Sequence, residues 1–117
     1  MAHAIRIHAP GGPEVLRYEE VAVGAPGPGE ARVRHTAIGV NYLDTYHRSG
    51  LYKLPLPSGI GSEAAGVVEA VGPNVDWVKP GDRVAYAAGP VGAYATERIV
   101  PISASGPTRS PTGTSER

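Results

Sequence analysis

The stretch ARVRHTAIGVNYLDTYHRSG, residues 31–50, joins a strand pattern directly to a helix pattern. In residues 31–38, small or apolar side chains alternate with polar ones, and Arg32 and Arg34 fall in the polar set. Alternation of this kind is typical of a strand that is buried on one face only. We therefore expect a half-buried strand here, with both arginines facing solvent.

The second half of this stretch carries the start signal of a short helix, expected over residues 42–49. Asn41 is a favourable N-cap residue, and Asp44 places an acidic side chain in the first turn. Asp44 and Arg48 are four positions apart, which is the spacing at which two side chains can form an ion pair along a helix.

On both sides of this stretch, short apolar segments alternate with glycine and proline. The chain has 16 Gly and 12 Pro in 117 residues. Further strands are expected at residues 2–8, 15–23, 64–71, 83–88 and 93–100, the first two as a hairpin. Many short strands between such turns indicate a small antiparallel barrel or sandwich. The fold is predicted to be mainly β with a short helix.

The apolar pattern stops near residue 101. Residues 103–117 are rich in Ser, Thr, Gly and Pro and contain no aliphatic residue larger than Ala. Such a segment has nothing to bury and favours disorder. We expect a folded domain over residues 1–101 and a disordered polar tail over residues 102–117, as a truncation or an out-of-frame end would leave.

Charge and cysteine content exclude several classes of function. The 11 basic and 11 acidic residues give a formal net charge of +0, so neither nucleic acid nor an anionic membrane is an expected partner. The absence of cysteine excludes disulfides, thiolate nucleophiles and the commonest structural zinc sites. No segment has the apolar length of a signal peptide or a membrane span, and a cytoplasmic protein is expected.

Four motifs carry a family resemblance: GVNYLDTY at residues 39–46, RSGLY at residues 48–52, GSEAAGVV at residues 61–68 and KPGDRV at residues 79–84. Together they resemble the GroES-like catalytic domain of medium-chain dehydrogenases/reductases, in the branch of the zeta-crystallin-like NADPH:quinone oxidoreductases. The resemblance covers about residues 2–101. It implies a GroES-like partly open β-barrel within a two-domain, often homodimeric enzyme that reduces quinones or related enones with NADPH.

The second domain of that family, a Rossmann domain that binds NADPH, has no counterpart here. The one glycine candidate, GPVG at residues 89–92, lacks a third glycine and leads into a strand pattern, so a hairpin turn is expected there. The chain is therefore expected to be an incomplete copy that is inactive alone.

The zinc-dependent branch of the superfamily holds its metal with a Cys and a His at positions matching Asn41 and Ser62. Neither residue present here is a plausible direct zinc ligand. No metal is expected, and a zinc alcohol dehydrogenase is excluded as an interpretation.

The resemblance assigns roles to five residues. It implies that Asn41 and Tyr46 are catalytic, that Tyr52 contacts substrate, and that Asn41, Asp44 and Glu63 contact the cofactor. An amide offers two donors and an acceptor, and a phenol can donate to a quinone oxygen as negative charge develops there. Each residue also has a structural alternative: Asn41 and Asp44 as helix caps, the tyrosines as packed side chains, and Glu63 as an acceptor of backbone N–H groups.

A second class of function remains open on the sequence alone. The chain could be a non-enzymatic β-barrel module that uses its exposed apolar face to bind another protein.

Overall fold

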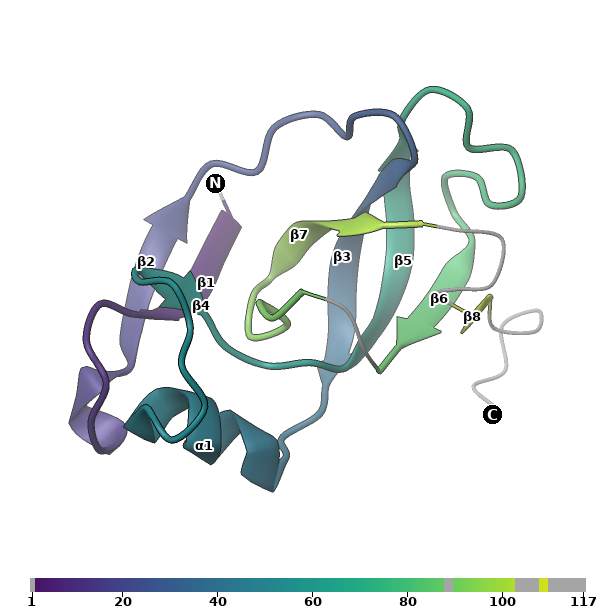
Figure 1. Cartoon of the computed structure of the whole chain (residues 1–117). Helices are drawn as coiled ribbons and strands as arrows, with labels where there is room; N and C mark the ends of the chain where they lie inside the picture. The colour runs from purple at the N-terminus through teal and green to yellow at the C-terminus, as the bar shows by residue number, and fades with distance from the viewer. Residues whose placement is uncertain (1, 88–89, 103–107, 110–117) are drawn as a thin grey trace.

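The computed structural model describes residues 2–87, 90–102 and 108–109, and this part of the chain is mostly β with one α-helix (Figure 1). In chain order the elements are β1 (Ala2–Ile7), the 3-10 turn η1 (Pro13–Val15), β2 (Arg17–Val21), β3 (Glu30–Ile38), α1 (Tyr42–Ser49), β4 (Ser58–Gly59), β5 (Ala64–Val71), β6 (Arg83–Tyr86), β7 (Glu97–Pro101) and β8 (Thr108–Arg109). Within these residues no helix is long and apolar enough to cross a membrane.

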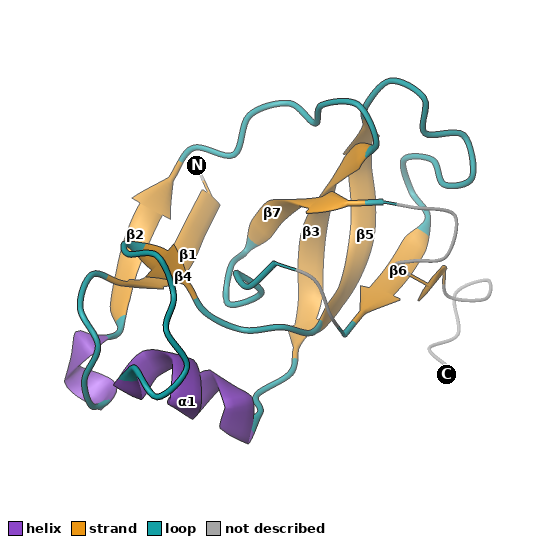
Figure 2. Ribbon diagram, viewed as in Figure 1, coloured by secondary structure: helices purple, strands orange, loops and turns teal. Residues whose placement is uncertain are grey.

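The described strands form two antiparallel sheets, with the orders β2-β1-β4 and β7-β3-β5-β6-β8. Figure 2 shows that the sheets stand side by side without joining into a continuous ring, and that α1 lies at one end of the pair. The predicted class, mainly β with a short helix in a partly open barrel, is confirmed. So is the predicted hairpin, in which β1 pairs with β2.

The alternation in β3 produces the expected half-buried strand. Ala31 and Val33 are fully buried and pack in a core with Val68 of β5 and Val84 of β6. Because successive side chains of a strand point to opposite faces, the intervening arginines leave the core.

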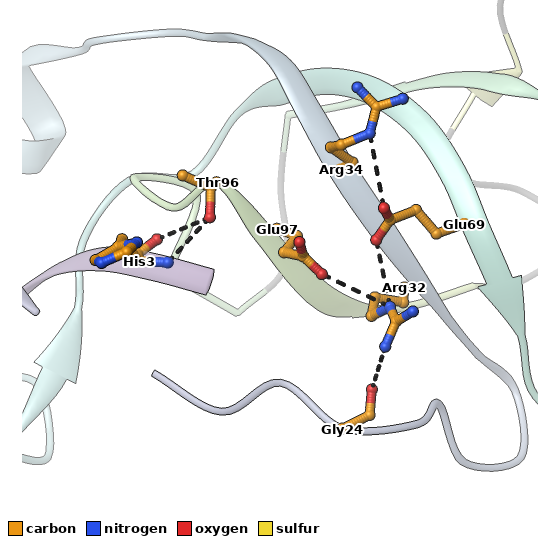
Figure 3. A network of polar contacts seen from close by, with 7 residues as sticks. All are labelled: His3, Gly24, Arg32, Arg34, Glu69, Thr96 and Glu97. Atoms are coloured by element: carbon orange, nitrogen blue, oxygen red, sulfur yellow. Dashed lines mark hydrogen bonds and ion pairs between the residues drawn. The ribbon is translucent and has the colours of Figure 1, made fainter. Parts of the chain in front are cut away.

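The outward-facing arginines of β3 are paired with acidic residues (Figure 3). Arg32 Nε lies 3.3 Å from Glu69 Oε1 and 3.7 Å from Glu97 Oε1, and Arg34 Nε lies 3.6 Å from Glu69 Oε2. These ion pairs link β3 to both of its neighbours. Such partly exposed pairs contribute little each, about 0 to 1 kcal/mol, so their main effect is to neutralise charge on this face.

The KPGDRV motif contains a tight turn at residues 79–82. The Asp82 N–H donates to Lys79 O at 3.0 Å, and the Lys79 N–H donates to the Asp82 carboxylate at 3.1 Å. Gly81 has φ of +94°, a conformation that glycine adopts without strain. The turn delivers the chain directly into β6.

Several strand boundaries differ from the sequence prediction. The second strand begins at Arg17 because the preceding residues form η1. The last predicted strand begins at Glu97 rather than at residue 93, because the chain changes partner on the way. Tyr94 O accepts from the Ile5 N–H of β1, whereas Thr96 O accepts from the His35 N–H of β3. The segment of residues 90–96, which we call the strap, therefore crosses from one sheet to the other. β6 ends at Tyr86.

Part of the predicted polar tail is described. Ile102 is buried in the core and its N–H donates to Gly29 O at 2.7 Å, so it belongs to the folded unit. Thr108–Arg109 form β8 beside β6. These three residues lie with the strands in this structure; the division into a domain and a tail stays a prediction, and the other tail residues lie outside the described part of the chain.

Gly66 lies where β5 approaches β3 most closely. A Cβ at this position would overlap the carbonyl oxygen of Arg34, which belongs to the neighbouring backbone and cannot move freely. Gly66→Ala is therefore expected to lower the free energy of unfolding by about 2 kcal/mol or more, as overpacking does. Gly27→Ala is the matched control, because its Cβ would meet only the flexible side chain of Glu30 at 3.1 Å. Urea unfolding measures both, and equal stabilities would contradict the close approach.

Candidate functional site

The N-terminus of α1 is capped as predicted. Asn41 precedes the helix in an extended conformation, with φ of −130° and ψ of 156°. Its N–H donates to Asp44 Oδ2 at 3.1 Å, and the Asp44 N–H donates to Asn41 O at 3.0 Å. The helix ends at Gly50, which has φ of +88°. The predicted helix over residues 42–49 is confirmed.

Asp44 is buried, with 4% of its surface exposed. Tyr94 OH donates to Asp44 Oδ2 at 2.6 Å, while Asp44 Oδ1 is buried without a hydrogen-bond partner. Burial raises the pKa of Tyr94 strongly, and the hydrogen bond to the Asp44 carboxylate raises this pKa further. The phenol is thus held as a proton donor.

The ion pair that the sequence suggested between Asp44 and Arg48 is not formed. Arg48 Nε instead donates to the carbonyl oxygen of Gly11 at 3.1 Å, and so ties α1 to the loop after β1. The reason is burial: the Asp44 carboxylate points toward Tyr94 and away from the exposed side of the helix.

Asn41 and Glu63 are brought together although they are far apart in the sequence. Asn41 Nδ2 donates to Glu63 Oε1 at 3.0 Å, and the Gly39 N–H donates to Glu63 O at 3.1 Å. The Asn41 side chain is exposed and that of Glu63 is half-buried. Glu63 is therefore an acceptor of a side-chain amide, and it fixes the direction of that amide.

The two tyrosines of the predicted site also contact each other. The rings of Tyr46 and Tyr52 meet edge to face, with centroids 5.5 Å apart, and the Tyr52 N–H donates to Tyr46 O at 3.2 Å. Both rings are exposed, at 40% and 51%. Neither tyrosine is a core residue in the described structure.

The five predicted residues thus form two groups on α1 and its flanking segments. One group contains Asn41, Asp44 and Glu63, and the other contains Tyr46 and Tyr52. No hydrogen bond among residues 2–87 and 90–102 joins the two groups.

A shallow groove of about 490 Å³ runs beside the first group. It is bordered by Gly39, Glu63 and Tyr86, and the rest of its lining is Ile38 and the alanines at positions 37, 64, 65, 85 and 87. Glu63 lines the groove, and through its hydrogen bond to Glu63 the Asn41 side chain lies beside it.

Large apolar side chains are exposed between β3 and β4. They are Ile38, Val40, Tyr42, Leu43, Tyr46, Leu51, Tyr52 and Leu56. These side chains follow one another along the chain; where such side chains form a contiguous patch, the patch marks a surface that another protein part covers.

Sequence reasoning missed a second polar cluster. His35 donates from Nδ1 to Ala95 O at 2.8 Å and accepts at Nε2 from Tyr86 OH at 2.9 Å. Arg98 lies beside Tyr86, with its Cζ 5.8 Å from the ring centroid. Burial lowers the pKa of His35 and raises that of Tyr86, so both stay neutral. In the sequence these residues fit an ordinary strand pattern, which gave no signal of their contact.

The chain offers little to the phosphates of a dinucleotide. The described α-helix begins beside the Asp44 carboxylate, and a negative side chain there opposes phosphate binding. Gly92, the last residue of the turn predicted at residues 89–92, leads into the segment before β7 rather than into a helix, and residue 89 of that turn lies outside the described residues. Among the described residues no three His, Asp or Glu side chains cluster as a metal site would require.

The chain matches the family described as the alcohol dehydrogenase GroES-like domain over residues 27–106. It is 62% identical over 101 residues to a quinone oxidoreductase of Pseudomonas aeruginosa, and the aligned segment covers 86% of this chain and 31% of that protein. A 2-haloacrylate reductase of a Burkholderia species is 52% identical over 106 residues, covering 86% of this chain and 32% of that protein.

Solved structures of quinone oxidoreductases also superpose on this chain. A quinone oxidoreductase of Pseudomonas syringae superposes with a TM-score of 0.83 at 56% identity, over 86% of this chain and 31% of that one. An Escherichia coli quinone oxidoreductase solved with NADPH gives a TM-score of 0.81 at 48% identity, over 86% and 31%. The chain therefore spans about a third of the length of these relatives.

The buried imidazole of His35 predicts a pH dependence of stability. Its pKa in the folded chain lies below the ordinary value of 6.5, so the unfolded chain binds a proton that the folded chain does not. Stability is expected to fall as the pH drops from about 7 to about 5. His35→Gln should flatten this slope in urea unfolding measured across that range, and equal slopes for the two proteins would contradict the assignment.

Proposed function

This chain belongs to the alcohol dehydrogenase GroES-like domain family, and we propose that it forms the substrate-facing domain of an NADPH-dependent reductase of quinones or related enones. The relatives with the highest identities quoted above are oxidoreductases, which makes reduction the class of chemistry to expect. The observation that carries the proposal is the exposed amide of Asn41, whose direction is fixed by Glu63 at 3.0 Å.

When bound, NADPH supplies the hydride, so the domain has to orient the nicotinamide and polarise the carbonyl group of the acceptor. Asn41 would hold the amide end of the nicotinamide, with Glu63 and Asp44 keeping Asn41 in place. Tyr46 would donate its phenolic proton toward a carbonyl oxygen of the acceptor as charge develops there. Tyr52 would border the acceptor ring while holding Tyr46 edge to face.

The exposed apolar side chains of residues 38–56 support this proposal as the face on which a nucleotide-binding domain would rest. They also fit the alternative, a module that binds an unrelated protein without catalysis. The two functions differ in one respect: only a reductase domain restores activity when it is joined to a nucleotide-binding domain of the same family.

A domain graft tests the proposal. Residues 1–101 would replace the matching segment of the Pseudomonas aeruginosa quinone oxidoreductase, to which the chain is 62% identical. The graft is expected to oxidise NADPH with quinones. The isolated chain is expected to show negligible activity, because hydride transfer needs donor and acceptor carbons held about 3 to 3.5 Å apart. A folded graft that binds NADPH but reduces no quinone or enone would reject the proposal.

In the active graft, Asn41→Ala and Tyr46→Phe are each expected to lower kcat/KM by roughly tenfold or more, which corresponds to one hydrogen bond of about 1.5 kcal/mol. The control is Tyr18→Phe, on β2, whose side chain is 68% exposed and lies outside both groups of the site and outside residues 38–56. It should leave the kinetics unchanged. Wild-type kinetics in the first two variants would assign Asn41 and Tyr46 to structural roles.

A further inference from the structure

We propose that Tyr94 is a positioning residue that, through Asp44, sets the orientation of Asn41. The effect of Tyr94 on catalysis rests on the proposed function, whereas its effect on the orientation of Asn41 does not. Tyr94 lies on the strap between β6 and β7, far from α1 in the sequence, and no motif in the sequence points to it.

The strap holds Tyr94 firmly in place. The Tyr94 N–H donates to Ile60 O at 2.9 Å, and Tyr94 O accepts from the Ile5 N–H at 2.8 Å. The ring lies against Gly61, where a Cβ would come within 2.5 Å of Tyr94 Cδ1. Gly61 has φ of +101°, so both its conformation and its missing side chain make room for the ring. The backbone and the ring of Tyr94 are thus both held in place, and so is its hydroxyl group.

One carboxylate oxygen of Asp44 connects Tyr94 on the strap to the N-terminus of α1. Asp44 Oδ2 accepts from Tyr94 OH at 2.6 Å and from the Asn41 N–H at 3.1 Å. Asp44 is buried, and its other oxygen has no hydrogen-bond partner. A buried carboxylate depends strongly on the few donors that it has. Removal of the phenol would leave Asp44 with a single donor from the N-cap, and the carboxylate would rotate or admit water.

The effect reaches the side chain of Asn41. The Asp44 contact fixes the backbone of Asn41, and with it the direction of the Cα–Cβ bond. The Asn41 amide then reaches Glu63 Oε1 at 3.0 Å. Tyr94 contacts Asp44, and Asp44 contacts the backbone of Asn41. A change at Asp44 therefore makes the orientation of the Asn41 amide less fixed, although Tyr94 and Asn41 do not contact each other directly.

The first test uses the 117-residue chain itself, in which Tyr94→Phe removes only the hydroxyl and keeps the ring over Gly61. The two side-chain amide protons of Asn41 are followed by NMR. Their chemical shifts are expected to move toward those of a freely exposed amide. Tyr86→Phe is the matched control, since it removes a half-buried hydroxyl that donates to His35 Nε2 at 2.9 Å, and it should leave these signals in place.

Unchanged Asn41 signals in a folded Tyr94→Phe chain would overturn the proposal, and so would an equal movement in Tyr86→Phe, which would indicate general loosening. If Tyr94→Phe does not fold, Asp44→Asn takes its place, with movement of the Asn41 signals expected and their constancy overturning the inference.

The second test places Tyr94→Phe in the active graft. A mispositioned amide should lower kcat by about tenfold and change the KM for quinone by less than about twofold, because the acceptor-binding tyrosines are untouched. An unchanged kcat would overturn the catalytic part. A wild-type graft without activity would reject the proposed function, while the Asn41 signals in the isolated chain would still decide the positioning role.

Discussion

The negative charge of Asp44 lies where the β-sheets meet the helix, almost wholly removed from solvent. Burial of an ionised carboxylate is costly unless donors surround it. Tyr94 and the N-cap of α1 provide those donors at 2.6 and 3.1 Å. The placement of α1, and with it the candidate site, follows from this requirement, because the helix cannot shift without leaving the carboxylate unpaired.

The sheets serve to bring the donors to one place. The strap that carries Tyr94 crosses from β1 to β3, and it can do so because Gly61 leaves room for the aromatic ring. Glu63 begins the segment that continues into β5, so the same stretch of chain supports the ring and fixes the amide of Asn41. Gly61, which makes room for the Tyr94 ring, and Glu63, which accepts from the Asn41 amide, are only two positions apart.

Local patterns in the sequence predicted the local features. Alternation predicted β3, and the Asn41–Asp44 spacing predicted the cap. Features that depend on distant contacts could not be predicted. The partner of Asp44 is Tyr94 rather than Arg48, because the packing of the strap decides which side of the helix is buried. The resemblance named the site residues, but only the structure separates them into two groups.

A double-mutant cycle between Asp44→Ala and Tyr94→Phe tests the central claim most directly. The free energy of unfolding of the chain, both single variants and the double variant is measured in urea. Because a hydrogen bond to a charged group contributes about 1.5 to 3 kcal/mol, the account predicts a coupling energy in that range between the two residues. A coupling energy within about 0.5 kcal/mol of zero, with both single variants folded, would contradict it.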